Sequence, residues 1–216
     1  MTLFARLKGD NELIWDSYIN HKFVKQIANG TLKESSFKYY LSQDYLFLIH
    51  FARAYALAAY KSDNLADIRQ AVNGLNAIIN TEMDLHIKFC SDWDLSESNM
   101  EALPEAAETM AYTRYVLEKG SSGDLLDLHV ALAPCIIGYA EIGNLFKDQI
   151  RSNPFGTWIE MYASDEYQAI ASAEIDQLET LMGSRGGEGR FKSLSKIFNQ
   201  ATKLETAFWQ MGLNAE

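Results

Sequence analysis

The sequence has only two cysteines, three prolines and fewer basic than acidic residues. Cys90 and Cys135 are too few for a disulfide framework and no Cys-x-x-Cys motif occurs, so we expect reduced thiols. The chain has 19 Lys and Arg residues against 29 Asp and Glu residues, which gives a net charge of −10. Nucleic acids and anionic membrane surfaces are bound by clusters of basic residues, so this charge argues against both as partners.

Segments for export or membrane insertion are also lacking. Residues 1–10 contain no apolar core of the kind found in signal peptides, so we expect none. We expect no apolar run that approaches the length needed to span a bilayer, and therefore no transmembrane segment. Together with the acidic charge, these features predict a soluble cytoplasmic protein.

Sequence motifs for metals and nucleotides are absent as well. The Glu-x-x-His pairs of di-iron bundles do not occur, because Glu82 precedes His86 by four residues rather than three. There is no zinc-binding spacing, no P-loop and no dinucleotide fingerprint. The sequence therefore predicts neither a metal site nor a cofactor.

Helical periodicity is present in nearly every segment, whereas alternating Val-, Ile- or Thr-rich strands are not. We expect one all-α domain over residues 1–216, a bundle of about eight helices. The predicted helical segments are 11–30 with Gly30 as its stop, 33–62, 65–92, a short turn at 96–102, a helix from Pro104 to Lys119, 124–151, two helices within 155–182 that break near Ala163–Ser164, and 191–212. Loops are expected at 120–123 and 183–187, where glycine and serine gather.

Cys135 stands in the long apolar segment 124–151, directly after Pro134. A proline inside a helix lacks the N–H that would bond to residue 130, so we expect a kink one residue before the thiol. Tyr139 follows four residues later and falls on the same helix face. A buried cysteine is more often a packing residue than a nucleophile, so these features alone leave its role open.

Two carboxylates interrupt apolar helix faces. Asp44 lies among large apolar side chains, with Phe47 three residues later on the same face. Glu205 is followed at the third and fourth positions by Phe208 and Trp209, and packing against these rings would raise the pKa of its carboxyl. A raised pKa suits an acid–base group. The alternatives are an exposed aspartate and a glutamate at the rim of its helix, and periodicity does not separate them.

The chain contains eleven tyrosines, which is many for an all-α protein. Most buried tyrosines pack their rings and keep the hydroxyl close to a polar group or water. We single out Tyr112, Tyr139 and Tyr162, whose role depends on where they lie relative to the thiol.

Four motifs resemble those of the TenA family, also called thiaminase II. They are Tyr40-x-x-x-Asp44-Tyr45-x-Phe47, Pro134-Cys135-x-x-x-Tyr139-x-x-Ile142-Gly143, Asn153-Pro154-x-x-x-Trp158-Ile159-x-x-Tyr162-Ala163 and Glu205-x-x-Phe208-Trp209. Each motif alone is weak, but the four occur in the family's order and at its spacing. The resemblance covers essentially the whole chain.

The resemblance implies the haem-oxygenase-like all-α fold, a homotetramer and a hydrolase without a cofactor. Family members that have the cysteine act on aminopyrimidines related to thiamin. They release hydroxymethylpyrimidine from aminomethylpyrimidine and also cleave thiamin, in a salvage route for thiamin biosynthesis. By resemblance, Cys135 is the nucleophile and Glu205 is the acid–base group that protonates a ring nitrogen.

The other residues carried over from the resemblance bind the substrate. The carboxylate would accept a hydrogen bond from the pyrimidine amino group, the tyrosines would hydrogen-bond around the site, and the phenylalanines would flank the ring. These residues are Asp44, Phe47, Tyr112, Tyr139, Tyr162 and Phe208.

Three other functions stay open at this point. A haem-binding protein of the same fold would use a histidine such as His21, but that hypothesis gives Cys135 and the two carboxylates no role. A regulator is the second, although direct DNA binding conflicts with the acidic charge. A protein that only binds a thiamin-like pyrimidine is the third, and a turnover assay separates it from an enzyme. The motifs do not select among aminomethylpyrimidine, its formyl derivative and thiamin as substrate.

Overall fold

The computed structural model describes residues 1–91, 93 and 95–215, and all regular secondary structure in these residues is helical. The predicted all-α class is confirmed, with more helices than expected because several are short. The α-helices are α1 (Leu3–Asp10), α2 (Glu12–Ile19), α3 (Lys22–Ala28), α4 (Glu34–Lys61), α5 (Leu65–Ala77), α6 (Met83–Ser91), α7 (Glu97–Glu101), α8 (Ala107–Ser122), α9 (Leu125–Phe146), α10 (Gly156–Ala163), α11 (Asp165–Arg185) and α12 (Glu188–Asn214). A π-helical turn, Ile78–Glu82, joins α5 to α6, and a 3₁₀ turn, Lys147–Gln149, follows α9.

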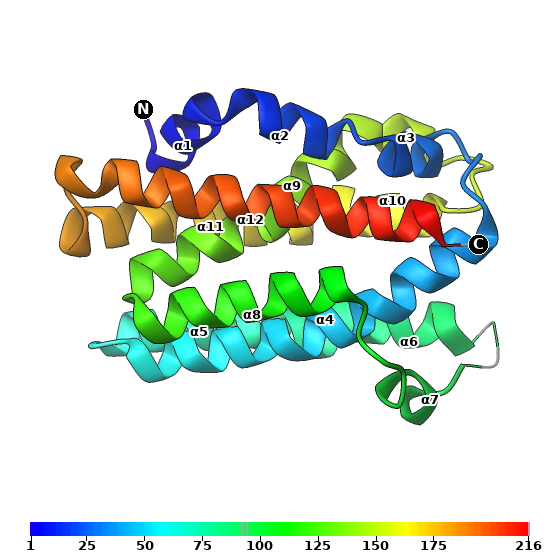
Figure 1. Cartoon of the computed structure of the whole chain (residues 1–216), viewed down its shortest axis with the longest axis horizontal. Helices are drawn as coiled ribbons and strands as arrows, with labels where there is room; N and C mark the ends of the chain where they lie inside the picture. Colours follow the sequence, from blue (N-terminus) through cyan, green and yellow to red (C-terminus); the bar gives the residue numbers. More distant parts are fainter. Residues whose placement is uncertain (92, 94, 216) are drawn as a thin grey trace.

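The helices surround α9. Figure 1 shows α12 running along the molecule beside α11, with α1, α2 and α3 on one side and α4, α5 and α8 in a layer on the other. α9 crosses between these groups and packs against α8, α10, α11 and α12. Most of its side chains are buried, including that of Cys135. The candidate site forms where α4, α9 and α12 meet.

The segment Leu125–Gln149 is apolar and long enough to cross a membrane by length and composition alone. We expected no run of that length, and this expectation was wrong. In the folded chain, 89% of its most apolar window is buried inside the protein, as in the core helix of a globular fold.

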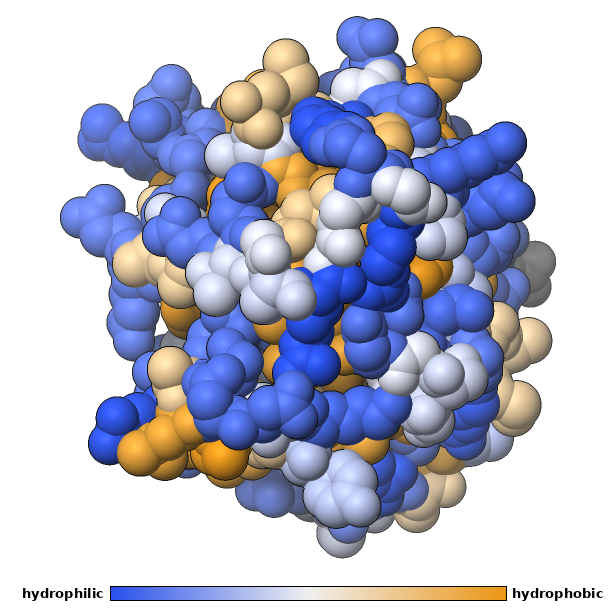
Figure 2. Space-filling view, turned by 90° about the vertical axis from the view of Figure 1, so that its left-hand side faces the viewer, coloured by the Kyte–Doolittle hydropathy of each residue, from blue (hydrophilic) through white to orange (hydrophobic). Residues whose placement is uncertain are grey.

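Polar side chains hold the beginning of α9. The Asp124 side chain accepts from the Asp127 N–H and the Asp127 side chain accepts from the Asp124 N–H, which forms a reciprocal cap. Arg190 of α12 donates to both carboxylates, at 2.6 Å and 2.7 Å. Figure 2 views this end of the molecule, where most of the surface is hydrophilic. The contacts tie α12 to the start of the helix that carries Cys135.

The turn that carries Cys135 packs directly against α2. The helix is continuous through Pro134, whose carbonyl oxygen accepts a hydrogen bond from the Tyr18 hydroxyl at 3.2 Å. One turn later, a Cβ at Gly138 would lie 2.3 Å from a carbon of the Tyr18 ring. A side chain at this position would therefore push α2 away from the turn that holds the thiol.

Several predicted boundaries are confirmed. Gly30 has a φ of 72°, in the region that favours glycine, and follows α3 directly after its C-cap. α10 ends at Ala163, and the Ser164 side chain then caps α11. The short turn expected at 96–102 is α7, which begins with a capping box at Ser96.

The two glycine- and serine-rich junctions are shorter than predicted. The expected loop at 120–123 was wrong, because α8 continues to Ser122. Gly120 is packed so closely that a Cβ there would lie 2.7 Å from a Leu57 methyl carbon. The expected linker at 183–187 was also wrong in part, because α11 runs to Arg185 and α12 begins three residues later.

Two predicted helix starts differ as well. α1 begins at Leu3, with Thr2 as its N-cap, in a stretch for which we predicted no helix. α8 begins at Ala107 rather than at Pro104. The Gln43 side chain donates to the Pro104 carbonyl at 3.1 Å and holds that residue in the preceding loop.

The segment predicted as one helix over 65–92 has an irregular centre. α5 and α6 are joined by the π-helical turn, and Asp92 lies outside the described residues. A π-helical turn inside an α-helix adds one residue to the helical path and often occurs at functional sites. Here it ends at Glu82, one turn before His86.

Candidate active site

The side chains predicted for the site are all buried. Asp44 is 4% exposed and Glu205 is 1% exposed, so the alternatives of an exposed aspartate and a rim glutamate are wrong. The thiol-bearing Cys135 is 7% exposed. The buried residues are Asp44, Phe47, Tyr112, Cys135, Tyr139, Tyr162, Glu205 and Phe208.

Glu205, on α12, interacts with side chains of α8 and α9. The Tyr112 hydroxyl donates to Glu205 Oε1 at 2.9 Å. Burial raises the pKa of the Glu205 carboxyl to about 8; the hydrogen bond from Tyr112 lowers it, the charge of Asp44 raises it, and the Cys135 thiol lowers it. A carboxyl with a pKa of about 8 is mostly protonated at neutral pH, so Glu205 is equipped to donate a proton.

The Cys135 thiol, in contrast, must lose its proton to react as a nucleophile. Burial raises its pKa well above the ordinary value, and the negative charges of Glu205, Glu82 and Asp44 raise it further. The thiol therefore stays neutral at neutral pH. A reactive thiolate forms here only if a neighbouring group accepts the proton as the sulfur bonds to a substrate.

Asp44, on α4, is held by two donors on the same oxygen. Its Oδ2 accepts from the Tyr40 hydroxyl at 3.0 Å and from His86 Nε2 at 2.7 Å. His86 Nδ1 lies 2.7 Å from the Glu82 carbonyl oxygen. A carboxylate and a carbonyl only accept, so both ring nitrogens donate and the imidazole carries a positive charge. Burial by itself lowers the pKa of His86, but the hydrogen bond and charge of Asp44 outweigh it, and the net pKa is raised.

The second oxygen of Asp44 is available. In the hydrogen bonds found among the described residues, both donors to this carboxylate go to Oδ2. Oδ1 can therefore accept from a donor on a bound molecule without losing an internal contact.

Aromatic rings form one wall of the site. The Phe47 ring lies 4.9 Å from that of Tyr112 and 5.6 Å from that of Phe208, measured between centroids. The three rings come from α4, α8 and α12 and bring these helices together beside Glu205. Such a wall suits a flat heteroaromatic ligand.

Tyr139 lies on the face of α9 that we predicted but contacts a different partner. Its hydroxyl is 3.2 Å from the Tyr40 hydroxyl, and this contact extends the hydrogen-bond chain from Asp44. Its ring packs edge-on against Tyr162 at 4.7 Å. Tyr139 thus reaches the carboxylate through Tyr40, and it is not a direct hydrogen-bond partner of the thiol among the bonds found.

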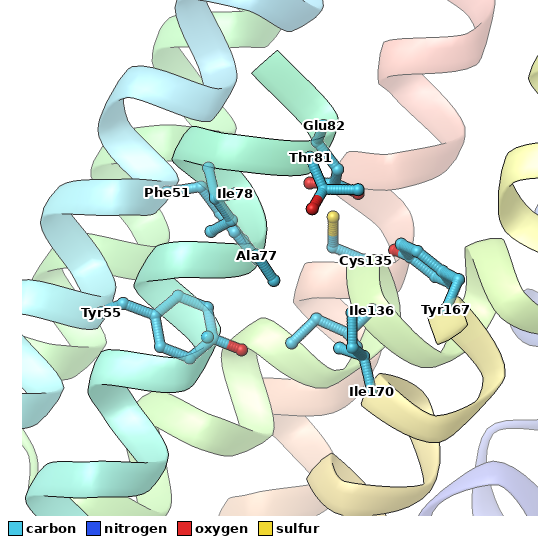
Figure 3. Close-up of a pocket in the computed structure, with 11 residues that line it drawn as sticks. Phe51, Tyr55, Ala77, Ile78, Thr81, Glu82, Cys135, Ile136, Tyr167 and Ile170 are labelled. Carbon is cyan, nitrogen blue, oxygen red and sulfur yellow. The ribbon is translucent and has the colours of Figure 1, made fainter. Parts of the chain in front are cut away.

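A narrow cavity leads from Cys135 between the π-helical turn and α11. Figure 3 shows the Cys135 sulfur pointing toward the side chains of Glu82 and Thr81. About 20 Å³ is open to the centre of a water molecule, which is room for about one water, so a ring enters only if the wall moves. The cavity is lined by Phe51, Tyr55, Gly74, Ala77, Ile78, Thr81, Glu82, Cys135, Ile136, Tyr167 and Ile170.

Sequence reasoning missed several polar side chains of this region. Tyr40 was part of a motif but was given no role. Glu82 and His86 were considered only as a failed metal pair, and Tyr167 was not considered. The signal that could have found the pair is its spacing, because two titratable residues one turn apart share a helix face.

Neither metal nor haem ligation has support in the described contacts. Within the described residues, no three His, Cys, Asp or Glu side chains gather in a way that would hold a metal ion. His21, the candidate for a haem ligand, lies at the N-terminus of α3, where its Nδ1 accepts from the Phe23 N–H at 3.3 Å. Its observed role is to cap this helix.

The model of the TENA/THI-4/PQQC family matches residues 10–215. The chain belongs to this family. It is 37% identical over 217 residues to an aminopyrimidine aminohydrolase of Halalkalibacterium halodurans, with 99% of this chain and 96% of the relative covered. A crystal structure described as a TenA family transcription regulator from Silicibacter sp. TM1040 is 44% identical, with a TM-score of 0.94 over 98% of this chain and 96% of that one.

The haem-oxygenase-like fold is confirmed by a more distant structure. A domain of unknown function with a heme oxygenase-like fold, from Shewanella denitrificans, matches with a TM-score of 0.72 over 96% of this TenA-family chain and 90% of that domain. At 12% identity this match shows the fold alone.

Proposed function

We propose that this TenA-family chain hydrolyses aminopyrimidines related to thiamin, with Cys135 as a covalent nucleophile. It converts aminomethylpyrimidine to hydroxymethylpyrimidine, and also cleaves thiamin, in salvage of the pyrimidine. The observation that carries the proposal is a buried Glu205 carboxyl that the Tyr112 hydroxyl holds at 2.9 Å, with a pKa of about 8, in the same buried site as the neutral Cys135 thiol. The name of the relative from Halalkalibacterium halodurans supports the same activity.

Binding orients the pyrimidine by its polar edge. The ring amino group donates to Asp44 Oδ1, the acceptor that internal contacts leave open. Phe47 and Phe208 flank the ring, and a ring nitrogen faces Glu205. The Tyr112 hydroxyl fixes the Glu205 carboxyl for this contact through its 2.9 Å hydrogen bond. Tyr139 and Tyr162 complete the polar and aromatic surroundings on α9 and α10.

The first chemical step transfers two protons through Glu205. Protonated Glu205 donates to the ring nitrogen, and the sulfur of Cys135 bonds to the adjacent ring carbon. The thiol proton passes to the Glu205 carboxylate, so the carboxyl ends the step protonated as it began. Because both groups are neutral at rest, no buried charge has to be created before substrate binds.

The ring adduct then breaks down in two stages. With its aromaticity lost, the ring expels the leaving group from the exocyclic methylene, and the leaving group takes the bonding electron pair. Water adds to the methylene carbon and releases a proton. When the carbon–sulfur bond breaks, the sulfur takes back a proton from Glu205 and the ring nitrogen returns its proton to Glu205, which restores the aromatic ring and the thiol. One difficult displacement thus becomes a series of easier steps.

The test is direct turnover by the purified protein. We expect hydroxymethylpyrimidine to form from aminomethylpyrimidine, from its formyl derivative or from thiamin, as followed by chromatography. Tight binding without product from any of the three would contradict the proposal and leave the pyrimidine-binding protein as the function.

We also propose that the chain is a cytoplasmic homotetramer, as the resemblance implies. Light scattering on the purified 24.4 kDa chain tests the assembly. A monomer at micromolar concentration would contradict it without affecting the chemistry.

A further inference from the structure

Glu82 is a buried acidic side chain that the chemistry above does not use. It lies at the end of the π-helical turn and is 9% exposed. Figure 3 shows it at the cavity beside Cys135. Within the described part of the chain, none of the ion pairs includes Glu82, and the nearby His86 ring is engaged with Asp44 instead. A carboxyl without a cationic partner in such a place is an available site for a positive charge.

Cys135 stands between two different halves of the site. On one side are Asp44, Glu205 and Tyr112, which the proposed function assigns to the pyrimidine. None of these three lines the narrow cavity, whereas Cys135 does. With the ring held on their side of the sulfur, the substituent that leaves the ring points into the cavity toward Glu82.

The substituents in question are cationic. The amine of aminomethylpyrimidine is protonated at neutral pH, as aliphatic amines are, and the thiazolium ring of thiamin carries a permanent positive charge. The formyl derivative has the same skeleton with a neutral amide in place of the amine. Besides Cys135 and Glu82, the titratable side chains that line the cavity are tyrosines, whose ordinary pKa is about 10. Glu82 is therefore the carboxyl of this lining that can carry a negative charge near neutral pH.

We propose that the cavity between the π-helical turn and α11 is the leaving-group pocket, and that the Glu82 carboxylate binds the positive charge that the leaving group carries in the bound substrate, before its bond to the methylene breaks. This inference rests on the proposed function, since it needs the pyrimidine on the Asp44 side of the thiol. The rings of Phe51, Tyr55 and Tyr167 line the same cavity and offer their faces to a cation, as aromatic side chains do for thiazolium or ammonium groups.

The surroundings of Glu82 predict how this recognition depends on pH. Burial raises the pKa of Glu82 to about 7, the charge of Asp44 raises it, and the charge of His86 and hydrogen bonding from Tyr167 lower it. Glu82 is therefore ionised above about pH 7 and neutral below. Affinity for a cationic leaving group should rise as pH increases through this value. The groups that face Glu82 from the packed elements are Asp44, Tyr55, His86, Cys135, Tyr162 and Tyr167.

The decisive variant is Glu82→Gln, which keeps the shape and removes the charge. We expect its KM to rise about ten- to hundredfold for aminomethylpyrimidine and thiamin, because the charge is present in the bound substrate, and to stay within about twofold for the formyl derivative. Asp84→Asn is the matched control, because it removes one carboxylate from the exposed face of α6 two residues away. An equal rise in KM for all three substrates, or no rise for any, overturns the proposal.

Two further measurements keep this test independent of turnover and of the variant's folding. Calorimetry on the Cys135→Ser background should show tighter binding of the amine than of the formyl derivative, and Glu82→Gln should remove the difference. In the wild type, KM for the amine should fall relative to KM for the formyl derivative as pH rises through about 7. A constant ratio of these two KM values across pH 6–8 would contradict the proposal, because the leaving group would then not bind at Glu82. Absence of turnover with a charge preference in calorimetry would contradict the proposed function alone.

Discussion

His86 Nε2 lies 2.7 Å from Asp44 Oδ2, while Nδ1 of the same ring holds the Glu82 carbonyl oxygen at 2.7 Å. The imidazole therefore joins the carboxylate of α4 to the end of the π-helical turn. It fixes the direction of the Asp44 side chain, which we propose recognises the pyrimidine amino group. His86 acts through Asp44 and is a positioning residue.

Replacement of His86 by Gln should destabilise the protein. Removal of one partner from a buried ion pair costs about 3–5 kcal/mol, because the remaining charge is left without compensation. The pKa of His86 is raised above its ordinary 6.5, so its stabilising contribution is complete below pH 6.5 and is lost as pH rises through the folded-state pKa. Urea unfolding of wild type and variant should therefore differ most near pH 6 and less at pH 9. The double variant Asp44→Asn/His86→Gln should recover part of the loss, and a pH-independent difference would argue against an ion pair.

Cys135→Ser should lower turnover by about three orders of magnitude or more with the fold kept, because a serine hydroxyl is a far weaker nucleophile. Steady-state kinetics on aminomethylpyrimidine measures it. Cys90→Ala is the control: this thiol is also buried, and burial raises its pKa to about 11, but it does not line the cavity. Wild-type turnover in Cys135→Ser would rule out the covalent mechanism.

Glu205→Gln should depress kcat more than it raises KM, because proton transfer matters mainly in the transition state. The pKa of Glu205 is about 8, and its protonated form is the donor, so wild-type kcat should decrease as pH rises through about 8. The variant should lose this limb of the profile. A change confined to KM would leave Glu205 with a binding role only.

Asp44→Ala should weaken binding of hydroxymethylpyrimidine by about 1–3 kcal/mol, because the ring amino group loses its acceptor. It should also reduce discrimination against the analogue without the amino group. Calorimetry with both ligands on both proteins tests this. Equal affinity of the wild type for the two ligands would remove Asp44 from the recognition of the amino group.

Local patterns predicted the helices well and the contacts between them poorly. The break before Ser164 was predictable because a capping residue interrupts the periodicity there. The loop expected at Gly120 was wrong because local composition suggests a turn, whereas packing against the distant Leu57 decides the structure. A helix cap depends on residues close in sequence, whereas the backbone conformation at a buried glycine depends on residues that are distant in sequence and close in space.

The same distinction applies to the site. Motif spacing selected Asp44 and Glu205, and the structure shows both buried. Their partners were not predictable from one helix at a time, because His86 is 42 residues from Asp44 and Tyr112 is 93 residues from Glu205. Such pairs exist only once the bundle brings their helices together.

The π-helical turn lets the chain between α5 and α6 carry one residue more than a regular helix along the same path. An extra residue in a regular α-helix would rotate everything after it by about 100°, whereas the π-helical turn takes up that residue locally. His86 lies four residues beyond this turn and faces Asp44. Loss of one residue from the turn, such as the exposed Asn80, would leave a regular α-helix in which the imidazole still faces the carboxylate. Loss of a residue from the regular part of α6 before His86 would instead rotate the imidazole away from the carboxylate, although every side chain of the site would be unchanged.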